Sequence, residues 1–275
     1  MGGIPLTDVA DVSLMNSLLE TLSTLCSQTF NPGKLPEHLS QMKEASEELM
    51  TMFAARAIGG VSSAWTHQPF PSLSVFKSCT ATLHKMAKTV NTDECRAETL
   101  VAIAGVNRLH CTSAVSDPSS VRLFDAEFLN DTLPKGLMML KSITSASEKG
   151  VPEHVSDLLV ALQLLSEDPV AVVILSNLII QIPDCLTWIL NAICSTDPTV
   201  MKSIGWRLLR VLSTAVVFNK GLGELVQPRW PELLRTWKSK INAESCGSTI
   251  ASYNCSSLMN LMVGLPSPTC DDPLW

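Results

Sequence analysis

The side chains best suited to chemistry in this sequence are its five histidines and nine cysteines. No histidine belongs to a His-Glu-x-x-His pattern, and no Cys-x-x-Cys pair or mixed Cys/His set has the spacing of zinc ligands. His110 and Cys111 are adjacent, but neighbouring residues on a helix do not face each other. We therefore predict no metal site and no catalytic site at these residues, and we expect the pair to be partly buried at a helix end.

Other catalytic patterns are also missing from the sequence. It contains no Gly-x-Ser-x-Gly elbow, no P-loop and no Gly-x-Gly-x-x-Gly fingerprint. The stretch "GLGE" (Gly221–Glu224) follows "VVFNK" and is predicted to be a loop, and the paired carboxylates Glu47-Glu48 and Asp271-Asp272 lie in polar contexts. We predict a protein that is not an enzyme and uses no cofactor. The alternative is a helical-bundle enzyme whose catalytic residues lie far apart in sequence.

The tryptophans of the last third suggest a different kind of site. Trp230 and Trp237 are seven residues apart in "RWPELLRTWKSKI", so they share one face of a predicted helix. Core packing is the favoured interpretation, and an exposed aromatic anchor for a partner is the other. The same helix carries Arg235 and Lys238, within the densest basic run of the chain. These four residues are the predicted partner-binding candidates.

Composition limits the kinds of partner. The chain has 275 residues, of which 46% are hydrophobic and only 17% charged, against about a quarter in an average soluble protein. This shortage of charge predicts that part of the surface is covered by a partner or by further protein beyond these ends, in which case the chain is one end of a larger array. Its 20 basic and 26 acidic residues give a net charge of −6, which makes direct nucleic-acid binding unlikely.

The cysteines and the N-terminus bear on location. The cysteines are odd in number, scattered, and mostly set in apolar helical patterns, which favours reduced thiols in the cytoplasm or nucleus. The N-terminal "MGGIPLTDVADVS" lacks the features of a signal peptide. The sequence leaves the oligomeric state open.

Apolar residues recur with helical period along most of the chain, and no long run alternates with period two. We predict an all-α protein with a helical hairpin at 1–60, a connector at 61–72, a helical-repeat array at 73–245 and a C-terminal helix with a Cys/Ser/Pro-rich tail at 246–275. The expected helices after the connector cover about 73–90, 94–111, 119–131, 135–147, 153–166, 170–181, 184–195, 198–217, 230–241 and 248–263.

Asp-Pro pairs precede three of these segments, at Asp117, Asp168 and Asp197. Asp can accept a hydrogen bond from the first turn of a helix, and Pro suits the first helical position. Breaks or caps at 152, 168, 183 and 197 are 16, 15 and 14 residues apart, so two intervals make a helical hairpin of repeat size. The spacing favours an irregular α-solenoid of antiparallel helix pairs over the alternative, a globular helical bundle.

The stretch from Val170 to Cys194 is the most apolar in the chain and long enough to span a bilayer. Pro183-Asp184 interrupts it, and no basic cluster flanks it closely. We predict two buried helices joined by a tight turn rather than a membrane segment. Four apolar side chains should be largely buried there: Leu178, Ile182, Leu186 and Leu190.

The segment "MKSIGWRLLRVLSTAVVFNKGLGELVQ", within Pro152 to Gln227, resembles the second half of an armadillo or HEAT-type repeat, with a capped helix, paired leucines and a short Gly-containing turn. The resemblance covers about a quarter of the chain and includes no diagnostic binding residue. It implies an α-solenoid that binds other proteins along one surface. The Cys/Ser/Leu-rich texture is similar to that of large armadillo-like proteins, and a nuclear complex, including a meiotic one, is the setting that this likeness suggests.

Overall fold

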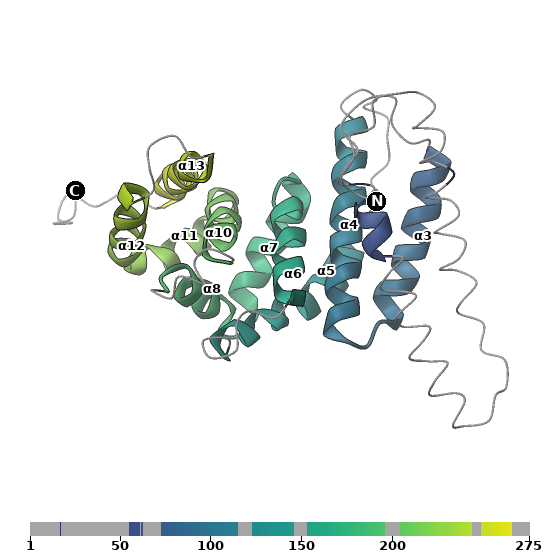
Figure 1. Ribbon diagram of the computed structural model, residues 1–275, viewed down its shortest axis with the longest axis horizontal. Helices are drawn as coiled ribbons and strands as arrows, with labels where there is room; N and C mark the ends of the chain where they lie inside the picture. The colour runs from purple at the N-terminus through teal and green to yellow at the C-terminus, as the bar shows by residue number, and fades with distance from the viewer. Residues whose placement is uncertain are drawn as a thin grey trace. The chain divides into compact units, whose positions relative to one another are not determined.

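A computed structural model describes Ser17, residues 55–60, Ser62 and residues 73–114, 123–145, 153–195, 204–243 and 249–265. Every element in these ranges is a helix and none is a strand, which confirms the predicted all-α class (Figure 1). The caps predicted at Asp117 and Asp197, most of the 1–60 hairpin, most of the 61–72 connector and the tail after 265 lie outside the described residues.

The chain divides into two units, Met1–Phe128 and Leu129–Trp275. The division falls inside the range 73–245, which the sequence predicts to be a helical-repeat array. In the first unit, α3 (Leu73–Thr89) packs against α4 (Asp93–Ala114) through buried apolar residues such as Leu83, Met86, Leu100 and Ile103. Asp93 and Glu94 occupy the first turn of α4, where negative charge stabilises the helix dipole. Arg56 binds Glu98 of α4 at 2.7 Å.

The helices that follow are α5 (Ala126–Leu137), which begins just before the division, the 3-10 helix η1 (Met138–Ser145), α6 (Glu153–Leu165), α7 (Pro169–Gln181), α8 (Cys185–Ile193), α10 (Trp206–Phe218), α11 (Lys220–Val226), the short 3-10 helix η3 (Gln227–Arg229), α12 (Trp230–Ala243) and α13 (Thr249–Gly264). Within the second unit α10 packs against five of them, α6, α7, α8, α11 and α13. Its buried residues, including Leu208, Leu209, Leu212 and Val216, are at most 1% exposed. The core of this unit is therefore built around α10.

Asp168 caps α7 as the sequence predicts. Its side chain accepts a hydrogen bond from the Val170 amide at 3.0 Å, and Pro169 occupies the first turn. Pro183 and Asp184 also separate α7 from α8 as predicted, although Asp184 makes no side-chain cap. Asp184 instead adopts a left-handed conformation with φ of 61°, which turns the chain between the two helices.

Two of the four residues predicted to be buried in this pair of apolar helices are buried. Leu178 and Leu190 are buried, which confirms the prediction, whereas Ile182 and Leu186 are only half-buried. Ile182 lies at the C-terminal cap of α7 and Leu186 in the first turn of α8, so both belong to the turn rather than to a helix centre.

No single described helix is long and apolar enough to cross a membrane; by length and composition alone, α7 and α8 pass that test only as a pair, bent by 101°.

Three local predictions were wrong. The helix predicted at 119–131 begins only at Ala126, because residues 123–125 are not helical. The sequence predicts a helix break between 131 and 135, but α5 continues through Pro134 to Leu137, where Leu133 and Leu137 are buried. Burial of this apolar face outweighs the amide hydrogen bond that proline cannot donate. The stretch "GLGE" is helical rather than a loop, because the Asn219 side chain accepts from the Leu222 amide at 3.2 Å and caps α11.

Two glycines allow the backbones around α10 to approach closely. A Cβ placed on Gly264, at the end of α13, would lie 2.6 Å from Val216 Cγ1 and 2.9 Å from the Val216 carbonyl carbon. A Cβ on Gly223 of α11 would lie 2.6 Å from the Gly264 carbonyl oxygen. Contacts below 3 Å are far inside normal van der Waals range, so α10, α11 and α13 meet at a point where only glycine fits.

Gly264→Ala should therefore lower the free energy of unfolding by about 1–3 kcal/mol, since the added methyl group must displace packed backbone. Gly221→Ala is the matched control. Its Cβ would meet only Asn219 Oδ1, at an ordinary 3.4 Å, and alanine is the better helix former. Urea denaturation of the three proteins measures the difference. Equal destabilisation by the two substitutions would contradict the close approach.

Candidate functional site

The four predicted partner-binding residues lie on opposite faces of α12. Trp230 and Trp237 are buried, at 7% and 2% exposure, together with Leu233. Arg235 and Lys238 are exposed. The structure thus brings the two indole rings into the core, in line with the favoured interpretation, and leaves the two cations on the outward face.

The Trp237 indole fixes how α12 sits on its neighbour. Its Nε1–H donates to the Ile193 carbonyl oxygen at 3.2 Å, and the bond is buried. Ile193 is the last residue of α8, where carbonyl groups lack partners within the helix. Trp237 satisfies one of them, so the inward face of α12 and the end of α8 are held together by both packing and a directional bond.

Charged and thiol groups surround the same junction. Arg229 Nε donates to Glu232 Oε2 at 2.6 Å, and this bond, with smaller contributions including those from Cys194 and Arg235, lowers the Glu232 pKa. Burial raises the pKa of the Cys194 thiol to about 11, and the Glu232 carboxylate acts in the same direction. A thiol held protonated in this way is a poor nucleophile, so the junction has the character of a structural contact.

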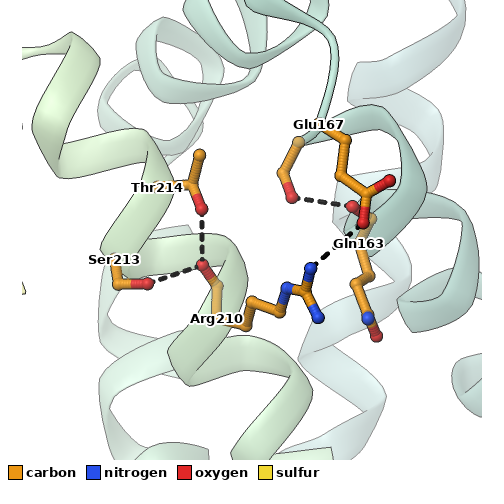
Figure 2. Close-up of polar contacts among 6 residues, drawn as sticks. Gln163, Glu167, Arg210, Ser213 and Thr214 are labelled. Carbon is orange, nitrogen blue, oxygen red and sulfur yellow. Dashed lines mark hydrogen bonds and ion pairs between the residues drawn. The ribbon is translucent and has the colours of Figure 1, made fainter. Parts of the chain in front are cut away.

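A second polar cluster joins the α6–α7 turn to α10 (Figure 2). Arg210 Nη2 lies 3.1 Å from Glu167 Oε1, and the Ser213 and Thr214 hydroxyls donate to the Arg210 carbonyl at 2.8 and 3.0 Å. Glu167 directly precedes the cap residue Asp168. Because the Arg210 and Glu167 side chains are both partly exposed, the pair is expected to orient the turn more than to stabilise the fold.

The first unit contains a stack of aromatic rings around His84. The imidazole lies 4.0 Å from the Phe128 ring at an interplanar angle of 8°, and Phe124 lies 5.6 Å away. Burial lowers the His84 pKa, while Asp125 raises it and Lys88 lowers it. The burial that lowers its pKa favours the neutral ring, which stacks as part of an aromatic cluster.

In the part of the chain that the structure describes, no group of three or more His, Cys, Asp or Glu side chains could hold a metal ion.

The chain matches no family model, no curated protein and no solved structure. The fold alone therefore assigns its class, an all-helical protein.

Sequence reasoning missed Leu234, which is 40% exposed on the outward face of α12. The signal was present, because Leu234 and Arg235 lie four and three residues before Lys238, so each of them neighbours Lys238 on the helix surface. It also missed the exposed apolar residues Met259, Met262 and Val263 on α13. Their spacing indicates a helical stripe, but the sequence does not say whether another helix covers it.

Trp237→Phe should lower the free energy of unfolding by about 1–3 kcal/mol, because the buried Ile193 carbonyl loses its donor while most of the ring volume remains. Lys238→Ala, one residue away on the outward face, should change it by less than about 0.5 kcal/mol. Chemical denaturation followed by circular dichroism compares the two. A neutral Trp237→Phe substitution would contradict the role assigned to the indole bond.

His84 predicts a pH dependence of stability. Its folded-state pKa is depressed by burial, so the unfolded chain binds the proton more tightly, and this contribution to stability is present above the unfolded pKa of about 6.5. It should be lost as the pH falls through the folded-state pKa. Thermal melts of His84→Phe, which keeps a ring in the stack, should show a smaller loss of stability between pH 7 and pH 5 than the wild type. Identical pH profiles would contradict this assignment.

Proposed function

We propose that this protein is a non-catalytic helical-repeat scaffold, an armadillo/HEAT-like α-solenoid that binds other proteins in the cytoplasm or nucleus. The observation that carries the proposal is the arrangement around α10 in the second unit. Figure 1 draws α6 and α7 on one side of α10, and α12 and α13 on the other. In a stacked array each helical pair packs mainly on its neighbours, and α10 would be the shared layer.

The exposed surface of these helices supports a binding role. α13 has no charged residue over its 16 positions, and Met259, Met262 and Val263 on its outer side are 66%, 42% and 79% exposed. α7 similarly exposes Val173 and Ile180, at 41% and 40%, while its other side is buried. Large apolar side chains gathered on outward helix faces are typical of surfaces that partners cover. A meiotic nuclear complex is one setting in which such a scaffold would act.

Hydrogen exchange tests the repeat organisation. Leu212→Ala, in α10, should increase exchange in α7, α8 and α13, because it creates a cavity in the shared layer. Leu261→Ala, in α13, should increase exchange in α12, α13 and α10 and have a smaller effect in α6. Uniform loosening of the second unit by both variants would indicate a globular bundle and overturn the solenoid.

Affinity capture from cells, quantified by mass spectrometry, tests the binding role with the same variants. Proteins captured by the wild type should be captured in smaller amounts by Leu212→Ala, because this substitution loosens the stack. They should be captured in equal amounts by Leu225→Ala, which changes an exposed residue of α11. The absence of any protein enriched on the wild type over a blank support would contradict the scaffold proposal.

A further inference from the structure

The outward face of α12 combines one apolar side chain with two cations on a fixed helix. Leu234, Arg235 and Lys238 are exposed, and their spacing places them on one side of the helix. The buried side of the helix is anchored by Trp230, Leu233 and Trp237, and the Trp237–Ile193 bond sets the rotation of the helix. A partner would therefore meet an already ordered surface, which reduces the entropy lost on binding.

Two other charged residues lie near the start of this helix. Glu232 forms an ion pair with Arg229, with 2.6 Å between Glu232 Oε2 and Arg229 Nε. Arg235 contributes only a small part of the lowering of the Glu232 pKa, behind Arg229 and Cys194. Arg235 and Lys238 are both exposed, and Arg235 also lies near enough to Glu232 to act on its carboxylate.

The charge of this face differs in sign from that of the chain. The chain carries a net charge of −6, whereas Arg235 and Lys238 give this helix face two exposed positive charges that attract an acidic partner locally. An Arg guanidinium can bind a carboxylate through two parallel hydrogen bonds, and a Lys ammonium adds a point charge. Leu234, beside them on the helix, offers contact area to an apolar side chain.

We propose that Leu234, Arg235 and Lys238 form a docking surface for an acidic segment of another protein, with Asp or Glu residues next to an apolar one. The carboxylates pair with Arg235 and Lys238, and the apolar residue packs on Leu234. This inference rests on the scaffold function proposed above and names the chemistry of its partner.

The test begins with selection of peptides from a random display library on the 275-residue chain. Selected peptides should be enriched in Asp and Glu. The tightest is then labelled, and its binding is followed by fluorescence anisotropy. Arg235→Glu/Lys238→Glu should weaken binding at least tenfold, Leu234→Ala should weaken it several-fold, and raising NaCl from 50 to 500 mM should weaken binding to the wild type.

The matched controls make the same changes elsewhere. Lys135→Glu/Lys220→Glu alters the net charge equally at two other exposed positions, and Leu225→Ala removes another exposed leucine. Both should leave affinity unchanged. Circular dichroism confirms that each variant is folded, which is expected because all the substituted side chains are exposed.

Other outcomes would overturn the proposal. Selected peptides without acidic enrichment, or full binding by Arg235→Glu/Lys238→Glu, would reject the acidic docking surface, while cellular partners captured by the wild type would leave the scaffold function standing. Failure of both peptide selection and cellular capture would reject both. A third outcome would reassign the cations to a lipid or nucleic-acid surface. In it, no acidic peptides are selected, the wild type binds phosphatidylserine vesicles or a 20-nucleotide DNA, and Arg235→Glu/Lys238→Glu does not.

Discussion

The second unit depends on the burial of α10. This helix contributes apolar side chains in several directions, and five neighbouring helices pack on it. The arrangement requires very close backbone approach on one side. There Gly264 and Gly223 have no side chain, and the backbones of α10, α11 and α13 come closer than a Cβ atom would allow. The α10–α13 contact is therefore set by backbone shape as well as by hydrophobic burial, and a single methyl group at Gly264 is enough to disturb it.

Directional bonds then set the orientation of the surrounding helices. Asp168 caps α7, Asn219 caps α11 and also donates to Asn177 of α7 at 2.9 Å, and Trp237 donates to the end of α8. The two caps satisfy amides in the first turns of α7 and α11, and the buried Trp237 bond satisfies a carbonyl at the end of α8. Packing supplies most of the stabilisation, and these bonds select one orientation of the helices.

This organisation explains how α12 can be both structural and available for binding. Its two tryptophan side chains are buried in the core, so they cannot serve as anchors that insert into a partner. What they provide is a fixed platform, on which Leu234, Arg235 and Lys238 face outward. The proposed recognition thus relies on charge and a modest apolar contact, which suits a surface that is ordered before the partner arrives.

The sequence by itself determined the helical class, the ends of α3 and α7, and the cap at Asp168, because these follow from periodicity and from local bonds within one turn. It also placed Trp230 and Trp237 on one helical face. Tertiary structure decided which way that face points, since spacing shows which residues share a side of a helix and not what covers it. It likewise decided that α5 continues through Pro134, because burial of Leu133 and Leu137 outweighs the local preference of proline. The helix at Gly221–Glu224 depends instead on a local bond, the Asn219 cap, which the sequence interpretation overlooked.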